Sequence, residues 1–146
     1  MPRNYTRWQL EALASFLPVF TREDFVFATP PVSEDGEAPT VFATCILSLE
    51  GEAFLDMVIN TGWVLPEFDW PEWAMTEEAA RLRDDPAALE NATAEQLARL
   101  ITVLVRQEHF GCDAMACSFR SGLLNRIVKR ANALSRSLRA TSATKA

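Results

Sequence analysis

A short segment near residue 110 holds the side chains best suited to metal binding. His109 is the only histidine of the chain, Cys112 follows three positions later, and Cys117 follows five positions after that. Neutral imidazole and cysteine thiolate are the usual ligands of zinc, so these three side chains and Cys45 form a candidate zinc set. The spacing lacks the paired Cys-x-x-Cys knuckles of zinc motifs. We therefore predict no metal site and no cofactor.

His109 and Cys112 also raise the hypothesis of a thiol nucleophile. A helix N-terminus lowers the pKa of a nearby thiol, and a neighbouring histidine serves as its base. A separation of three residues across Gly111 identifies no class of cysteine enzyme. A cysteine- and histidine-dependent enzyme is therefore an alternative function, and no catalytic residue is assigned. Small buried thiols and a histidine that stabilises a turn are the simpler interpretation.

An aromatic and proline-rich segment, Phe68-Asp69-Trp70-Pro71-Glu72-Trp73, is a candidate binding surface. Tryptophan is enriched at binding hot spots because it buries a large area at a small cost in entropy. We predict that Asp69, Trp70 and Trp73 contact a protein partner, from a wrapped loop rather than a regular element. The alternative is a structural clasp, in which the rings pack inward and Asp69 caps a helical turn that begins at Pro71.

The net charge of −6 is unevenly distributed along the 146 residues. Residues 1–95 hold 18 Asp and Glu against 5 Lys and Arg, a net charge of −13. Residues 96–146 hold 2 Asp and Glu against 9 Lys and Arg, a net charge of +7. The overall charge is therefore a poor guide to the partners of the protein.

The acidic part leads to the first functional hypothesis. Clustered carboxylates imitate a phosphate backbone and block proteins that bind nucleic acids. We expect a non-catalytic protein-interaction module of bacterial or phage origin. Its target would be a nucleic-acid-processing defence complex, which it would inhibit in the manner of an anti-CRISPR protein. The predicted contact residues in this part are Glu34, Asp35 and Glu37. Ordinary solubility is the simpler explanation of the same charges.

The basic part leads to the second functional hypothesis. Lys and Arg side chains on the last predicted helix, namely Arg126, Lys129, Arg130 and Arg136, could contact phosphates and release counterions. A nucleic-acid-binding protein is therefore an alternative. The helix lacks the interleaved aromatic residues of single-strand binders, and a solvated amphipathic face explains the same pattern.

Capping signals and apolar periodicity predict a mainly helical chain. Capping boxes at Thr6–Gln9 and Thr93–Gln96 start two helices, the first with Trp8 on its apolar face. Ser48 and Thr76 are further N-caps. Gly62 is placed to end the helix after Ser48.

Two long helices dominate the predicted core. The first carries Leu97, Leu100, Ile101 and Leu104 on one face, and the second is expected to run without a break from Ala116 to Leu138. Because Gly111 separates them, we expect an antiparallel helical hairpin. Residues 28–40 are predicted to form a loop. The run Val41–Leu47 is either a strand or a turn of helix.

These signals together predict an all-α, mainly helical fold with at most one short strand pair. Residues 1–140 would form a single compact domain, and residues 141–146 would fray. No stretch approaches the roughly 20 apolar residues of a membrane span, so we expect no membrane contact. The three cysteines, an odd number, and the absence of a signal core predict a cytoplasmic protein. The oligomeric state is left open.

Four runs of sequence resemble those of a known family. They are the run from Phe54 to Val64, Phe68-Asp69-Trp70-Pro71-Glu72-Trp73, the run from Leu100 to Phe110, and the run from Ala116 to Leu124, which contains Ser118-Phe119-Arg120-Ser121-Gly122-Leu123-Leu124 and is followed by Ile127. Over residues 49–131 the chain resembles an uncharacterised bacterial family, DUF6508. The resemblance implies a small, mainly helical cytoplasmic protein, with relatives across bacteria and mobile elements. It implies no activity and no site residue. Arg120 departs from the family pattern, which tends to have an acidic residue there.

Overall fold

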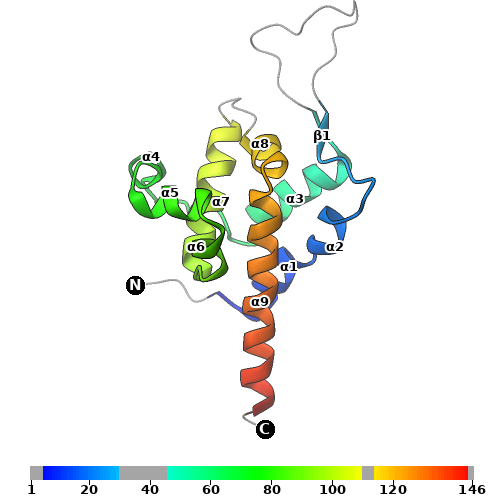
Figure 1. Cartoon of the computed structure of the whole chain (residues 1–146), viewed down its shortest axis with the longest axis vertical. Coiled ribbons are helices and arrows are strands. Elements are labelled where there is room, and N and C mark those ends of the chain that lie inside the picture. The colour runs from blue at the N-terminus through cyan, green and yellow to red at the C-terminus, as the bar shows by residue number, and fades with distance from the viewer. Residues whose placement is uncertain (1–4, 30–45, 110–113, 145–146) are drawn as a thin grey trace, which may run out of the picture.

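Helices make up most of the computed structural model, which describes residues 5–29, 46–109 and 114–144 (Figure 1). The elements in chain order are α1 (Arg7–Ala14), α2 (Leu17–Phe20), β1 (Ala28–Thr29), β2 (Ile46–Leu47), α3 (Leu49–Asn60), α4 (Trp70–Ala74), α5 (Glu77–Asp84), α6 (Pro86–Glu90), α7 (Ala94–His109), α8 (Ala114–Arg120) and α9 (Leu123–Thr144). The predicted mainly α fold is confirmed. None of the helices in these residues is long and apolar enough to cross a membrane.

The predicted short strand pair is also present. β1 and β2 are antiparallel, with Ala28 opposite Leu47 and Thr29 opposite Ile46. The end of the candidate segment Val41–Leu47 is therefore a strand. Residues 30–45, which hold the rest of that segment and most of the predicted loop, lie outside the described residues.

Side-chain caps start the helices where the sequence predicts. Thr6 and Gln9 form a capping box, in which the Thr6 hydroxyl accepts the Gln9 backbone N–H at 3.3 Å. Thr93 and Gln96 exchange the same pair of hydrogen bonds, at 2.9 and 3.1 Å. Ser48 and Thr76, the other two predicted N-caps, also accept backbone N–H groups, at the starts of α3 and α5.

The prediction for the apolar face of the first helix is wrong at Trp8. Its side chain is 64% exposed, whereas Leu10 and Leu13 are buried. Successive residues turn by about 100° in a helix, so Trp8 lies about 160° around the axis from Leu10. The short helix α1 buries only the face that carries the two leucines.

The prediction of an unbroken helix from Ala116 to Leu138 is wrong. Gly122 has a φ of +88°, a left-handed conformation that ends α8 and lets α9 begin at Leu123. The backbone N–H of Gly122 donates to the carbonyl of Phe119 at 3.0 Å, which closes the last turn of α8. α7 and α9 run in opposite directions, as expected (Figure 1). They do not form the simple hairpin that we expected, because α8 stands between them in the chain.

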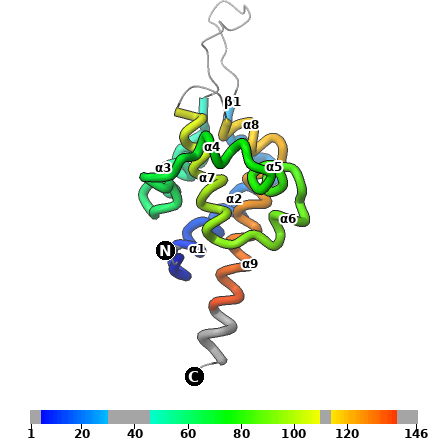
Figure 2. The backbone as a smooth tube through the Cα atoms, turned by 90° about the vertical axis from the view of Figure 1, so that its left-hand side faces the viewer, coloured from blue at the N-terminus to red at the C-terminus, as the bar shows by residue number. Residues whose placement is uncertain are grey.

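The helices are arranged on two sides of α7 and α9. Helices α4, α5 and α6 lie on one side, and α1, α2 and α3 lie on the other (Figures 1 and 2). The most extensive helix contact is between α1 and α9. α9 runs to Thr144, and its C-terminal part extends past the other helices (Figure 1).

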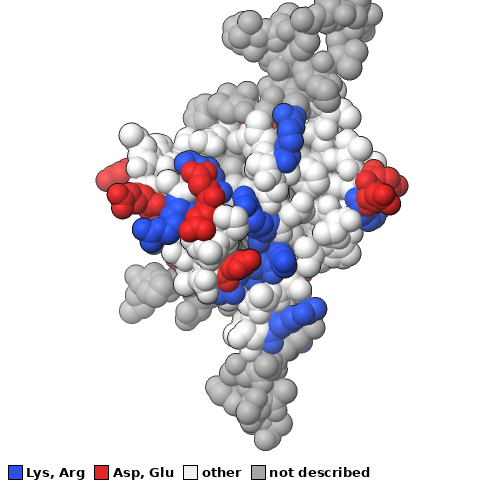
Figure 3. Space-filling view, in the orientation of Figure 1, with Lys and Arg blue, Asp and Glu red and all other residues white. Residues whose placement is uncertain are grey.

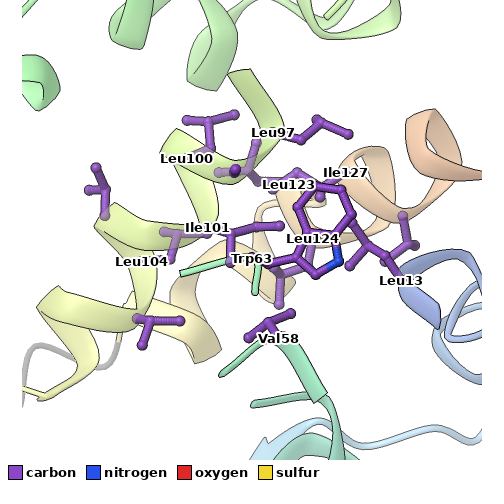
Figure 4. Packing of buried hydrophobic residues seen from close by; sticks show 14 of the residues in the cluster. Leu13, Val58, Trp63, Leu97, Leu100, Ile101, Leu104, Leu123, Leu124 and Ile127 are labelled. Carbon is purple, nitrogen blue, oxygen red and sulfur yellow. The ribbon is translucent and has the colours of Figure 1, made fainter. Parts of the chain in front are cut away.

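The core is centred on Trp63, whose side chain is fully buried among leucine and isoleucine residues of α7 and α9 (Figure 4). Gly62 has a φ of +84° and turns the chain after α3 toward this position, as predicted. The indole N–H of Trp63 donates to the carbonyl of Gln9 at 3.3 Å. The buried hydroxyl of Thr102 accepts the backbone N–H of Leu65 at 2.9 Å, which ties the segment after Trp63 to α7. This segment therefore reaches α4 from a fixed point in the core.

Candidate functional site

An open groove separates α4 and α5 from α7, α8 and α9. Its larger part has a volume of about 590 Å³ and its smaller part a volume of about 380 Å³. Both volumes fall within the range of ligand-binding sites. The two parts are adjacent, because Arg83, Leu104, Gln107 and Leu123 line both of them.

The smaller part of the groove is mostly apolar and is shaped by α4. The Oδ1 atom of Asp69 accepts the Glu72 backbone N–H at 3.2 Å, and Pro71 occupies the first turn. The predicted wrapped loop is therefore wrong for Trp70–Ala74, where this cap stabilises a short helix, whereas the predicted capping role of Asp69 is confirmed. Trp73 points into the core and is only 8% exposed.

Met75 follows α4 directly and forms the rim of this part. Its side chain is 89% exposed, the largest fraction among the exposed apolar residues of the described chain. Pro71 and Ala74 line the groove beside it. The apolar part thus has a buried floor and an exposed apolar edge.

The larger part is lined by more polar and charged side chains than the smaller part, and it lies where α8 meets α9. Ser118 of α8, Ser121 of the turn that follows it and Arg126 of α9 all line this part of the groove. The Nε atom of Arg126 is shielded from solvent and has no hydrogen-bond partner among the described residues. The side-chain amide of Gln107, at the junction of the two parts, makes no hydrogen bond within the same residues. Buried polar groups are normally hydrogen-bonded, so this end is equipped to receive polar groups of a ligand.

The charge at the polar end is positive on balance. Arg83 binds Asp84 with two hydrogen bonds, of 3.1 and 3.2 Å. The Arg83 hydrogen bond holds the pKa of the Asp84 carboxyl below its ordinary value, and the charges of Arg83 and Arg126 act in the same direction. Asp84 in turn raises the pKa of Arg83. The Asp84 carboxylate therefore lies near two guanidinium groups. It pairs with that of Arg83, and the Arg126 guanidinium has no ion-pair partner among the described residues.

The structure brings part of the predicted partner-binding set into the groove. Trp70 and Trp73 both line its apolar part, with Trp73 as a buried floor residue and Trp70 half-buried. Asp69 is exposed and serves as the cap of α4. The other predicted contacts, Glu34, Asp35 and Glu37, lie outside the described residues.

The residues of the nucleic-acid hypothesis lie along α9. Lys129 and Arg136 are exposed, and Arg126 and Arg130 are half-buried. The Nε atom of Arg130 donates to the carbonyl of Ala92 at 2.7 Å, which ties α9 to the turn before α7. Basic side chains run down the centre of the face over α9, and acidic ones lie mainly beside them over α4, α5 and α6 (Figure 3). A hollow of about 180 Å³ between α6 and α9 is lined by three of these cations.

None of the four α9 cations pairs with a carboxylate in the part of the chain that the structure describes. Four other arginines do form such pairs there, namely Arg7, Arg22, Arg83 and Arg99.

The candidate zinc and nucleophile residues are only partly described. His109 is exposed at the end of α7, and Cys117 is exposed on α8, where it lines the groove. Cys45 and Cys112 lie outside the described residues. Within the described ranges, no three His, Cys, Asp or Glu side chains come together as a metal-binding group.

The residues that sequence reasoning missed are those that complete the groove. Met75 has a weak local signal, because a large apolar residue stands between the end of α4 and the Thr76 cap of α5. Arg83 and Gln107 have no such signal. They meet only because α5 and α7 pack against each other.

Fold and groove together define a small, mainly helical domain whose groove has an apolar end and, at its other end, the guanidinium groups of Arg83 and Arg126. The chain belongs to a family of unknown function, DUF6508, whose family model matches residues 5–137. Neither a curated protein nor a solved structure matches the chain.

Proposed function

We propose that the protein is a non-catalytic protein-interaction module that receives a segment of its partner in the groove. The observation that carries this proposal is the exposed apolar rim, where Met75 stands 89% exposed beside Trp70 and Pro71. Covering such surface is favourable, at about 25 cal/mol per Å² of apolar area. Methionine and tryptophan are also enriched at protein interfaces. The polar groups at the other end of the groove would orient the bound segment.

The test is a capture experiment that compares two matched variants. The tagged full-length protein and its Met75→Lys and Leu49→Lys variants are incubated with nuclease-treated extract of the native host, and bound proteins are quantified by mass spectrometry. Leu49 is the control, because it is 84% exposed on α3 and does not line the groove. We expect a stoichiometric partner with the unmodified protein and with Leu49→Lys, and its loss with Met75→Lys. Equal capture by Met75→Lys would contradict the groove as the binding surface.

A narrower proposal concerns the consequence of binding. The partner would be a nucleic-acid-processing defence complex, inhibited as by an anti-CRISPR protein of a mobile element. The support is the net charge of −13 over residues 1–95, which resembles a phosphate backbone in sign. Both proposals place the protein in the cytoplasm, since an odd number of cysteines suits a reducing compartment.

Charge reversal tests the inhibitor proposal. Replacing Glu34, Asp35 and Glu37 together by lysine should abolish inhibition of the defence system in a plasmid-interference assay. The matched control reverses three exposed carboxylates elsewhere, Glu52, Asp56 and Glu67. If the first variant inhibits as well as the unmodified protein, these three carboxylates do not imitate phosphate.

Nucleic-acid binding by α9 is the second candidate function. It is supported by the four α9 cations, which have no carboxylate partner among the described residues. The affinity for a DNA duplex, measured by fluorescence anisotropy, should fall steeply with salt, and Lys129→Glu with Arg136→Glu should weaken it. The control is Arg81→Glu, which makes the same charge change at an exposed arginine of α5. A flat salt response would contradict this candidate.

A further inference from the structure

We propose that the groove recognises a peptide segment that carries one large apolar side chain and one carboxylate. The apolar side chain is held at the α4 end, and the carboxylate is held by Arg126. This inference rests on the proposed protein-interaction function and names the chemistry of the partner.

The apolar end has the size and lining for a single anchoring side chain. Its floor consists of buried carbon surface from Trp73, Leu100 and Val103, and Met75 stands at its edge. Its volume of about 380 Å³ exceeds what one large side chain requires. Burying a Leu, Met or Phe side chain there would favour binding, because it removes apolar surface from water.

The other end favours one negative charge. Arg83 is already paired with Asp84 through two hydrogen bonds, so its charge is compensated within the chain. Arg126 has no carboxylate partner among the described residues, and its shielded Nε donor has no hydrogen bond there. A carboxylate accepts two parallel N–H bonds from a guanidinium and supplies the single negative charge that is missing.

The junction between the two ends carries groups that fit a peptide backbone. Gln107 offers an amide that makes no hydrogen bond within the described residues. Ser121, in the larger part, offers a hydroxyl oxygen as an acceptor, since its O–H donates to the carbonyl of Ser118 at 3.1 Å. Because Gln107 lines both parts of the groove, a chain that spans them passes this side chain. An extended peptide can therefore place its anchor and its carboxylate at the two ends and exchange backbone hydrogen bonds between them.

Selection from a random peptide library displayed on phage tests the proposal. The full-length protein is immobilised, and the enriched peptides are sequenced. We expect a consensus with a large apolar residue and an Asp or Glu at a constant spacing from it. With Arg126→Glu, the acidic position should change to Lys or Arg while the apolar position is kept, because reversing one charge of a pair reverses the preference for its partner.

Two further variants keep the selection interpretable. Lys129→Glu makes the same charge change on the same helix but does not line the groove, so its consensus should equal that of the unmodified protein. Arg126→Met preserves the apolar stem of the arginine in case Arg126→Glu fails to fold, and it should lose the acidic preference without gaining a basic one. Circular dichroism checks that each variant is helical.

A synthetic peptide of the consensus sequence then gives the affinity. We expect Arg126→Met to weaken binding about tenfold or more and Lys129→Met to change it less than about threefold. A consensus without an acidic position, or an acidic position that persists in Arg126→Glu and Arg126→Met, overturns the proposal. If the consensus contains only an apolar position, and Met75→Lys no longer enriches it, the inference fails while the proposed interaction function stands. If no peptide is enriched and Met75→Lys captures the partner normally, both fail.

Discussion

Trp73 donates its indole N–H to the Oε1 atom of Glu78 across 2.8 Å. The same oxygen accepts a hydrogen bond from the guanidinium of Arg99 at 3.2 Å. One carboxylate oxygen thus links α4, which carries Trp73, to α7, which carries Arg99, through α5. These three helices form the wall and part of the floor of the groove, so this junction maintains the position of the floor residue Trp73.

Replacing Glu78 by alanine should destabilise the fold. The indole N–H of Trp73 and the guanidinium of Arg99 both lose their acceptor, which we expect to lower the free energy of unfolding by about 1 to 2 kcal/mol. Glu78→Gln retains an oxygen acceptor for the indole and should cost about half as much. Urea unfolding followed by tryptophan fluorescence measures both. Glu77→Ala is the control, since Glu77 is exposed on the same turn, and equal losses for the two alanine variants would contradict the junction.

Replacing Thr102 by valine should leave a buried backbone donor without a partner. The Thr102 hydroxyl accepts the N–H of Leu65 and donates to the carbonyl of Ala98 at 2.7 Å. The loss of the acceptor should lower the free energy of unfolding by about 1 to 3 kcal/mol. Thr102→Ser keeps the hydroxyl and removes only a methyl group. A valine variant as stable as the serine variant in chemical denaturation would show that the hydrogen bond contributes little.

Replacing Gly122 by alanine isolates the strain of the turn between α8 and α9. A Cβ atom there would meet no other atom within 4 Å, so only the φ of +88° is unfavourable. We expect a loss of about 1 to 2 kcal/mol for alanine in a left-handed conformation. Asparagine tolerates this conformation better, and Gly122→Asn should be less destabilised. Thermal unfolding ranks the three proteins, and an alanine variant as stable as the glycine protein would refute a left-handed turn.

The titration of Asp84 reports on the cationic end of the groove. Hydrogen bonding to Arg83 lowers the pKa of this carboxyl below its ordinary value of 3.8. Because folding lowers the pKa of Asp84, the ion pair stabilises the folded state at pH values above the ordinary pKa. This contribution is lost as the pH falls through the lower pKa of the folded state. The ¹³C chemical shift of the carboxyl carbon, followed by NMR, should therefore have a midpoint below 3.8.

Two variants separate the causes of that shift. Arg83→Gln should raise the midpoint of Asp84 toward its ordinary value, because it removes both the hydrogen bonds and the charge. Arg126→Gln should raise it less, since Arg126 acts only through its charge. A midpoint that does not move in Arg83→Gln would contradict the ion pair, and one that moves equally in both variants would place Arg126 in direct contact with Asp84.

Local sequence determined most of the helix starts. The Thr6–Gln9 and Thr93–Gln96 boxes and the Asp69 cap depend on hydrogen bonds between residues three apart, so neighbouring side chains suffice to specify them. The apolar stripe of the helix after Thr93 likewise follows from helical periodicity, and its predicted core residues are buried as expected.

The tertiary structure alone decided where α8 ends and how the groove is formed. No local signal in the sequence distinguishes Gly122 as a helix end, and the packing of α8 against α7 and α9 places a left-handed turn there. The meeting of Arg83 with Arg126, from helices more than forty residues apart in the chain, has no local cause. Which tryptophan becomes a floor residue and which stays exposed likewise depended on long-range packing, because burial reflects the neighbours that the whole fold supplies.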